Sequence, residues 1–315
     1  MDFKQLKALV TVAEVGSVTC AAELPHLVQP AVTRQICTLE QELGVPLFER
    51  TRHGMRPTEA GATLVERARR ALTELDRARA ELAPKPGVVT RIVTVSLLES
   101  AAERVAAPLT TAVRREHPGI ELRLLTAYSG HLQRWIDDGD VDLSLLCNLT
   151  STPSLNVRPL VRERLWAVAP PSAGLDPAHP VPFAEVAAQP LVMPSEGHAL
   201  RTLIDGAATE ADTEAAVAVQ TNAMNLQKRL VLGGHGWTIL PGIGIAADVP
   251  DGTLSAAPVC EPEVWRTVVL GTPRTERVTP AVDAVTRALV RQIHRTVREG
   301  EWPSARLWED RTGEE

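Results

Sequence analysis

A row of six small or hydrogen-bonding side chains occurs at helical spacing within residues 29–43 and contains no carboxylate. The row consists of Ala31, Thr33, Arg34, Cys37, Thr38 and Gln41. Its guanidinium, hydroxyl and amide groups can donate or accept hydrogen bonds, whereas most surface helices fill their exposed face with Glu and Lys. The row therefore predicts a helix face that contacts a polar partner.

The element that must carry this row is an amphipathic helix. Four apolar residues recur every three or four positions on the opposite face: Val32, Ile36, Leu39 and Leu43. Such a stripe is typical of a helix packed on a core. Pro30 is tolerated in the first helical turn, and Gly44 fits the C-terminal stop.

Two further helices and a β-hairpin are expected around this helix. Residues 2–14 have helical periodicity, and Ser17 is a suitable N-cap for a short helix over 18–24. A turn at 53–54 separates two short extended runs, the pattern of a β-wing. Residues 1–57 are therefore predicted to form a winged helix-turn-helix.

A long helix is predicted over 58–83, with Thr58 as its cap. Its apolar residues are spaced alternately four and three apart, which is an a/d heptad seam: Leu64, Ala68, Ala71, Leu75, Ala78 and Leu82. Packing on its own domain is one explanation, but so narrow a stripe favours pairing with a second copy. The Pro- and Gly-containing residues 84–87 then act as a hinge.

Composition divides the chain in the same place. The 315 residues, 44% of them hydrophobic, suit two or three globular domains. Residues 1–87 hold 12 Lys/Arg against 11 Asp/Glu, a net of +1, and the rest hold 21 against 28, a net of −7. No apolar run is long enough for a bilayer, so we expect a cytoplasmic protein without membrane contact. Neither a metal site nor a cofactor is expected, because the four Cys are far apart and lack a zinc pattern.

From residue 88 onward, strand-like and helix-like segments alternate, which predicts parallel β-sheets with crossover helices. Extended segments at 155–169 and 253–271 look like two crossings between lobes. We therefore predict a two-lobed α/β domain over 88–300, with lobe I at about 88–160 and 268–300 and lobe II at about 161–267. Residues 301–315 are expected to be an appended tail. Two lobes joined by two crossings would form a cleft for a small ligand.

The chain from residue 21 to 61 closely resembles the signature of LysR-type transcriptional regulators. The matching motifs are Ala21-Ala22, Gln29-Pro30-Ala31, Gln35-Ile36, Leu39-Glu40, the run from Leu43 to Arg50, and Thr58 to Gly61. The resemblance implies an α+β multidomain fold: a winged helix-turn-helix, a dimerising linker helix and a two-lobed domain like type II periplasmic binding proteins. It implies a sequence-specific DNA-binding regulator, not an enzyme.

The resemblance also implies where DNA would bind. The polar face of helix 29–43 would enter the major groove, with Thr33 and Arg34 at base edges. Phosphate or groove contacts would come from the helix start and the wing, which comprise Gln29, Pro30, Ala31, Arg50, Arg52 and His53. Two departures could weaken binding: Val28 replaces the usual Ser, and Pro25 replaces a Leu.

Effector positions implied by the family lie near helix starts of both lobes: Glu99, Ser100, Ser129, Ser195, His198, Thr221 and Thr238. Helix starts often bind carboxylates, but Glu99 and Glu196 would repel an anion, so a neutral or cationic effector stays open. Each serine could instead only cap its helix. The implied partners are operator DNA, an unidentified small molecule and further copies of the chain as a dimer or tetramer, with RNA polymerase as another candidate.

Two other functions stay open at this point. A regulator of the same family could respond to oxidation of Cys147 and Cys260, or could act without an effector. A solute-binding protein or an enzyme on the same two-lobed fold is the other alternative. The signature over 17–61 argues against it, and the chain contains no GxSxG, HExxH or Walker motif.

Overall fold

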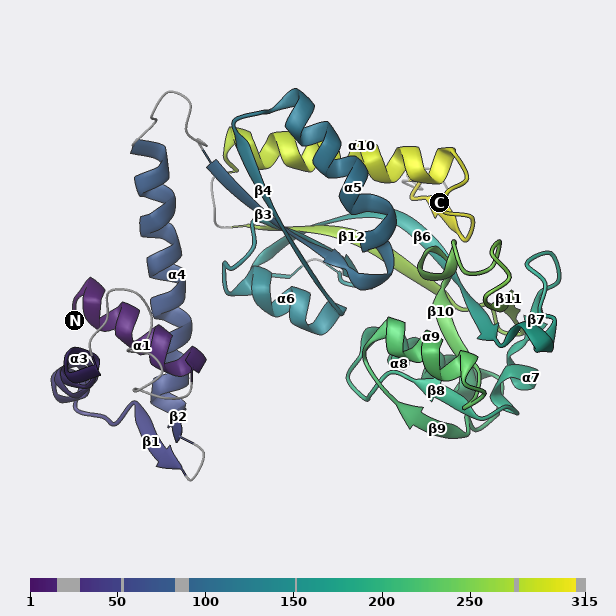
Figure 1. Ribbon diagram of the computed structural model, residues 1–315, viewed down its shortest axis with the longest axis horizontal. Coiled ribbons are helices and arrows are strands. Elements are labelled where there is room, and N and C mark those ends of the chain that lie inside the picture. The colour runs from purple at the N-terminus through teal and green to yellow at the C-terminus, as the bar shows by residue number, and fades with distance from the viewer. Residues whose placement is uncertain (16–28, 52–53, 83–90, 151, 275–277, 310–315) are drawn as a thin grey trace, which may run out of the picture. The chain divides into compact units, whose positions relative to one another are not determined.

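The computed structural model describes residues 1–15, 29–51, 54–82, 91–150, 152–274 and 278–309. The chain forms two compact units (Figure 1): the first comprises Met1–Arg91 together with Asp138–Asp140, and the second comprises Ile92–Asp137 and Val141 onward. The predicted helix at 18–24 and the predicted hinge at 84–87 lie outside the described residues. Among the described residues, no helix is long and apolar enough to cross a bilayer.

The first unit is a small helical domain with a β-hairpin. Its elements are α1 (Phe3–Val15), α3 (Gln29–Leu43), β1 (Phe48–Thr51), β2 (Gly54–Pro57) and α4 (Glu59–Leu82). The apolar stripes of α1, α3 and α4 meet in one core, in which Leu9, Val32 and Leu39 are fully buried. These elements confirm the predicted winged helix-turn-helix, in which the antiparallel β1 and β2 form the wing.

The start of α4 is hydrogen-bonded to the segment that precedes the wing strand β1. The Thr58 hydroxyl accepts the backbone N–H of Gly61 at 3.0 Å and donates to the carbonyl of Pro46 at 2.8 Å. This confirms Thr58 as the cap. A Cβ on Gly61 would lie 1.9 Å from the Leu47 carbonyl oxygen, so only glycine permits this approach.

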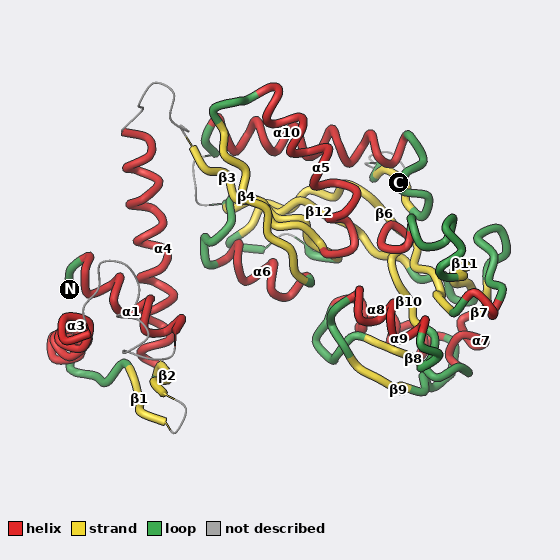
Figure 2. Tube along the Cα trace, in the orientation of Figure 1, coloured by secondary structure: helices red, strands yellow, loops and turns green. Residues whose placement is uncertain are grey.

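The second unit contains the remaining elements, helices in red and strands in yellow in Figure 2. In chain order they are β3 (Arg91–Leu98), α5 (Glu99–Glu116), β4 (Ile120–Ala127), α6 (Ser129–Asp137), β5 (Leu143–Cys147), β6 (Leu155–Ala169), η1 (Pro171–Ala173), β7 (Val181–Pro182), α7 (Phe183–Ala187), β8 (Leu191–Met193), α8 (Ala199–Glu210), β9 (Val217–Gln220), α9 (Met224–Leu232), β10 (Thr238–Pro241), η2 (Gly242–Ile245), β11 (Ser255–Cys260), β12 (Trp265–Pro273), α10 (Pro280–Arg298) and β13 (Ala305–Leu307). The alternation of strands and helices predicted beyond residue 88 is confirmed.

The main sheet is mixed, which corrects the expectation of parallel sheets. Its strand order is β4-β3-β5-β12-β6-β11-β7, with β10 and β13 also paired to β6. The pairs β3–β5 and β8–β9 are parallel, but β12 runs antiparallel to both β5 and β6. The reason is that the chain leaves lobe I along β6 and returns along β12, and the two strands pair with each other.

The two crossings predicted from the sequence are confirmed. Along β6, Leu155 and Val161 belong to one hydrophobic core, whereas Leu165 and Val168 belong to another. Strands β11 and β12 make the same change in reverse, because Val259 of β11 lies in the second core and Val268 of β12 in the first. The second unit therefore consists of two lobes joined by paired strands.

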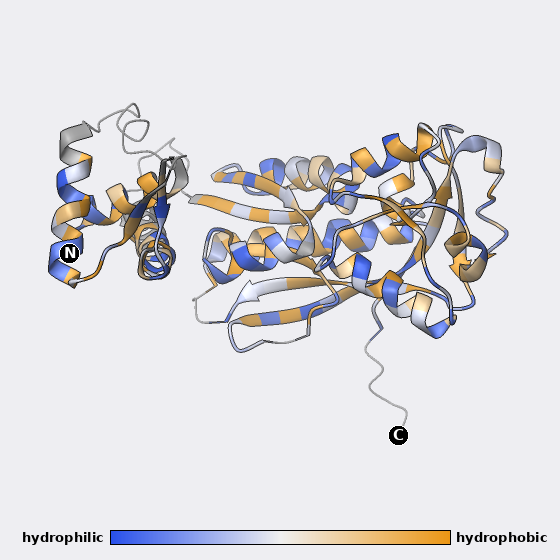
Figure 3. Ribbon diagram, turned by 90° about the horizontal axis from the view of Figure 1, so that it is seen from below, coloured by the Kyte–Doolittle hydropathy of each residue, from blue (hydrophilic) through white to orange (hydrophobic). Residues whose placement is uncertain are grey.

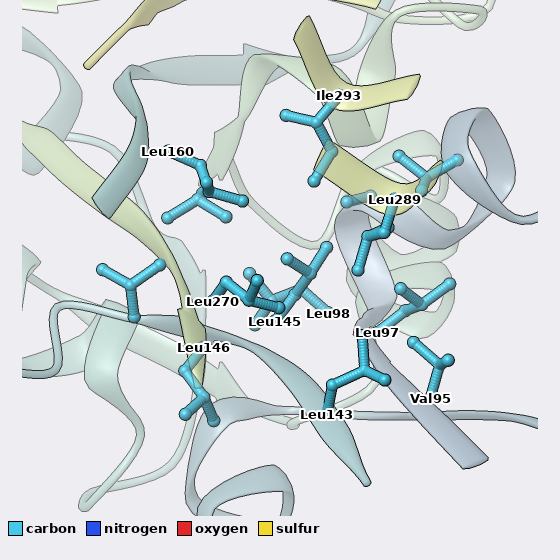
Figure 4. Packing of buried hydrophobic residues seen from close by; sticks show 14 of the residues in the cluster. Val95, Leu97, Leu98, Leu143, Leu145, Leu146, Leu160, Leu270, Leu289 and Ile293 are labelled. Atoms are coloured by element: carbon cyan, nitrogen blue, oxygen red, sulfur yellow. The ribbon is translucent and has the colours of Figure 1, made fainter. Parts of the chain in front are cut away.

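The core of lobe I lies between the sheet and its helices. Figure 4 shows Val95 and Leu97 of β3, Leu145 of β5, and Leu289 and Ile293 of α10 in one cluster, and all five are fully buried. Helices α5 and α10 lie on one side of the sheet and α6 on the other (Figure 1). In Figure 3 the apolar colour is prominent on the strands of this unit.

The expectation that residues 301–315 form an appendage is corrected for the described residues 301–309. Trp302 is fully buried in the core of lobe I, and β13 adds to β6. The reason is a chain reversal after α10, which returns the chain to the sheet.

Candidate functional site

The polar face of α3 points to solvent, as the sequence predicted. Thr33, Arg34, Cys37, Thr38 and Gln41 are all exposed. The Thr38 hydroxyl donates to the backbone carbonyl of Arg34 at 2.8 Å, so it is partly engaged within the helix. On the opposite face Val32, Ile36 and Leu39 are buried, whereas Leu43 is 42% exposed and does not contribute to the core as expected. Leu43 is the last residue of the helix.

A carboxylate braces this helix against the wing. Glu40 Oε1 accepts the backbone N–H groups of Leu47 and Phe48 at 2.7 and 3.2 Å. Sequence reasoning assigned Glu40 only to the family signature and did not foresee this contact. The brace fixes the position of the hairpin relative to the exposed face of α3.

The other predicted DNA contacts cannot be placed in the same way. Arg52 and His53 lie outside the described residues. Gln29, Pro30 and Ala31 begin α3, and Arg50 lies on β1. The structure describes the backbone of these four residues but not their side chains. Arg56, on the wing strand β2, is exposed.

The predicted seam of α4 divides into two parts. Ala68 is 2% exposed and Leu64 is half-buried, and both pack in the core of the first unit. Ala71 is exposed, and Leu75 is 48% exposed, which is unusual for a leucine. The side chains of Ala78 and Leu82 are not described. Only the middle of the seam is therefore open to a second copy in the described part of α4.

A pocket that is partly open to solvent lies between the lobes of the second unit. Lobe I contributes the end of β3 and the start of α5 with Glu99 and Ser100, together with Tyr128 and Cys147. Lobe II contributes the segments before and within α8 and α9, and β12 contributes Arg266. Seven of the fifteen lining residues have aliphatic, thioether or proline side chains: Leu98, Ala127, Pro194, Leu200, Met224, Leu240 and Pro241.

Arg266 and Glu163 form a buried ion pair at the base of this pocket. Arg266 is 5% exposed and Glu163 fully buried. The guanidinium donates to Glu163 Oε2 at 2.7 Å and to the Ser100 hydroxyl at 2.8 Å. Glu163 Oε1 accepts the Ile243 N–H at 3.0 Å and the Ser304 hydroxyl at 2.8 Å. The pair thus connects β6, β12, α5 and the chain after α10.

His198 caps α8 and faces Tyr128 across the cleft. Its Nδ1 accepts the backbone N–H of Leu200 at 3.0 Å, so Nε2 carries the proton of the neutral ring. The rings of His198 and Tyr128 stack with centroids 5.1 Å apart. Burial, and secondly the charge of Arg266, lowers the pKa of His198 to about 4. His198 is therefore an uncharged hydrogen-bond donor at neutral pH.

Glu99 connects the two lobes at the pocket. It is the first residue of α5, and its Oε2 accepts the backbone N–H of Met224, the first residue of α9, at 3.4 Å. Glu99 is half-buried. The carboxylate thus lies at the N-terminal ends of two helices, where a negative charge is favoured.

Three of the seven effector positions inferred from the resemblance line the pocket: Glu99, Ser100 and His198. The other four do not line it, namely Ser129, Ser195, Thr221 and Thr238, and Glu196 is exposed. Ser195 and Thr221 adjoin lining residues, and Thr238 is buried within β10. Sequence reasoning missed Arg266 and Tyr128, because a strand arginine and an isolated tyrosine carry no motif.

The two cysteines considered for redox control lie on strands that are not neighbours. Cys147 is on β5 and Cys260 on β11, with β12 and β6 between them. Three strand spacings amount to about 14 Å, beyond the reach of a disulfide. Burial raises the pKa of both thiols. Among the described residues no group of three His, Cys, Asp or Glu could hold a metal ion.

A winged helix-turn-helix with an exposed polar helix, followed by a two-lobed domain with a central pocket, defines the class of DNA-binding regulators with a separate sensing domain. Residues 3–62 match the helix-turn-helix domain described as bacterial regulatory, lysR family, and residues 87–293 match the LysR substrate binding domain. The chain therefore belongs to the LysR family and is a DNA-binding transcriptional regulator.

Similar proteins span nearly the whole chain. The transcriptional regulator BbuR of Bordetella bronchiseptica is 28% identical, covering 96% of this chain and 93% of its own. The hydrogen peroxide-inducible genes activator of Pectobacterium carotovorum is 27% identical, covering 90% of this chain and 96% of its own. Full-length CbnR, solved in complex with its target DNA, has a TM-score of 0.67 at 22% identity and covers 94% and 100%; it shares the fold.

Proposed function

We propose that this chain binds operator DNA through the exposed face of α3, as a dimer or a tetramer, and that a small molecule in the pocket between the lobes modulates the binding. The observation that carries the proposal is the exposed, carboxylate-free row on α3, held in place by Glu40 and the wing. A bacterial regulator of this kind acts in the cytoplasm, where the chromosome lies. RNA polymerase is a further candidate partner.

DNA recognition rests on Thr33 and Arg34. Helix α3 has 15 residues, so it is about 22 Å long, and its N-terminal turns are those that reach base edges in such domains. The Arg34 guanidinium matches the two acceptors of a guanine, and Thr33 suits a base edge or a thymine methyl. We assign the helix start and the wing to phosphate and groove contacts: Gln29, Pro30, Ala31, Arg50, Arg52 and His53.

Self-association rests on α4. Leu75 and Ala71 form the exposed middle of the seam, and their burial against a second copy would remove apolar area from water. A dimer would present two α3 helices to half-sites about one DNA turn apart, roughly 34 Å. This arrangement matches the two-fold symmetry expected of an operator.

A redox mechanism has less support in this chain. Several relatives are named as activators of genes inducible by hydrogen peroxide. Here Cys147 is buried with a raised pKa, whereas reactive thiols are exposed and have lowered pKa values. Cys147 and Cys260 are also too far apart to pair directly. A small-molecule effector is therefore the better proposal.

The test begins with DNA that the full-length chain selects from a random duplex pool. Arg34→Ala should weaken binding to the selected DNA by about 5- to 150-fold and relax the choice at one base pair of each half-site. Arg67→Ala is the matched control, because Arg67 is an exposed arginine on α4 and the charge change is identical. Failure to enrich any sequence, or an equal loss for the two variants on every duplex, would refute recognition through α3.

A further inference from the structure

We propose that the pocket selects a small apolar molecule that carries an ammonium or amidinium group, and that the carboxylate of Glu99 binds this group. This inference rests on the proposed function of the pocket as an effector site. It names the ligand class, which neither the family match nor the relatives specify.

The first observation is that Glu99 lacks a cationic partner. Among the described residues no Lys, Arg or His forms an ion pair with it. The hydrogen bond that its Oε2 accepts from the Met224 N–H is long at 3.4 Å. A half-buried carboxylate with one weak contact, facing a pocket, is able to accept hydrogen bonds from a bound cation.

The second observation is that several groups able to hold an anion already have partners within the chain. Arg266 is neutralised by Glu163 and also donates to Ser100. The N-terminal end of α8 is capped by His198. Glu99 occupies the N-terminal ends of α5 and α9, where an anion would otherwise bind.

The side-chain charges of the pocket also favour a cationic ligand. Its charged lining residues are Glu99 and Arg266, and Glu163 lies directly behind the arginine. Since His198 has a pKa of about 4, it adds no positive charge at neutral pH. The formal side-chain charges of the site therefore sum to one negative charge, located at Glu99, and this charge would attract the cationic group of a ligand.

The walls of the pocket suit the apolar part of such a ligand. Leu98, Met224 and Leu240 line it beside the ring of Tyr128. An aromatic or aliphatic body would pack against these side chains while its cationic end reaches Glu99. Sites of this kind combine an apolar lining with a few placed polar groups.

Three probes of similar size test the proposal: 2-phenylethylammonium, phenylacetate and the neutral 2-phenylethanol. Calorimetric titration of the full-length protein would give the affinity of each. Wild type should bind the ammonium at least about tenfold tighter than the carboxylate, as expected for one unit charge within a few ångströms. Glu99→Gln should abolish or invert this preference.

Glu103→Gln provides the control, because Glu103 lies on the same helix, is exposed and does not line the pocket. It should retain the preference of the wild type, and melting curves should show that both variants are folded. If wild type bound phenylacetate as tightly as the ammonium, or if both variants behaved alike, the role of Glu99 would be wrong while the pocket remained a ligand site. Absence of binding by all three probes would overturn the effector site itself.

Discussion

Replacing Arg266 by methionine should destabilise the second unit strongly. The substitution retains an unbranched side chain but leaves the Glu163 carboxylate fully buried without its cation. Only the Ile243 N–H and the Ser304 hydroxyl would still donate to it. Removing one partner of a buried pair costs about 3–5 kcal/mol, because the remaining charge has lost both its water and its counter-ion. We expect a loss in free energy of unfolding of that size.

Tryptophan fluorescence is a suitable readout for urea unfolding of this variant. All six tryptophans lie beyond residue 91, so the signal reports on the second unit alone. Arg295→Met is the matched control, since Arg295 and Glu299 form an exposed pair at the C-terminal end of α10, with side chains 62% and 49% exposed. Such a pair contributes about 0–1 kcal/mol.

A double variant separates the charge from the packing. Adding Glu163→Gln to Arg266→Met removes the unpaired buried carboxylate. The Gln side chain retains an oxygen that can accept hydrogen bonds from the Ile243 N–H and the Ser304 hydroxyl. The double variant should recover much of the lost stability, as buried pairs replaced on both sides often do. The reasoning is refuted if Arg266→Met costs no more than Arg295→Met, or if Glu163→Gln lowers stability further.

Two further predictions concern assembly and pH. Leu75→Asp would place a carboxylate in the exposed middle of the α4 seam, so light scattering should show loss of the dimer; a variant that is still dimeric at low concentration would place the interface elsewhere. The pKa of His198 is lowered from 6.5 to about 4, so the unfolded chain binds more protons between these values and stability should fall as pH falls from about 6.5 to 4. His198→Asn, which still offers Leu200 N–H an acceptor, should reduce this slope in fluorescence-monitored unfolding, and an unchanged slope would contradict the burial argument.

Much of the fold was predictable because helix and strand patterns are local. The stripe of Val32, Ile36 and Leu39 has helical spacing, and Gly44 has the positive φ of a helix stop at +71°. Both follow from the chemistry of residues a few positions apart. The outward face at Thr33 and Arg34 was predictable for the same reason, because burial of the apolar stripe leaves the opposite face exposed.

The pocket was predictable only in part. Glu99 and His198 were identified because helix starts are visible in sequence, but Arg266 was not, since 103 positions separate it from Glu163. That pair exists because β6 and β12 run side by side, and such pairing depends on the whole sheet. A one-residue change of register would move Arg266 to the other face of its strand.

The antiparallel crossing and the buried chain end were also decided by the tertiary structure. Alternating strands and helices predict crossovers, yet β12 follows no crossover helix and returns beside β6 in the opposite direction. Trp302 follows the last long helix in an acidic segment, a context that predicts a solvated tail. It is buried because the chain reverses after α10 and places it on the core of lobe I. Local patterns thus determined the helices and strands and the exposed face of α3. Long-range strand pairing determined which distant side chains meet in the pocket, because only the folded sheet brings them within hydrogen-bonding distance.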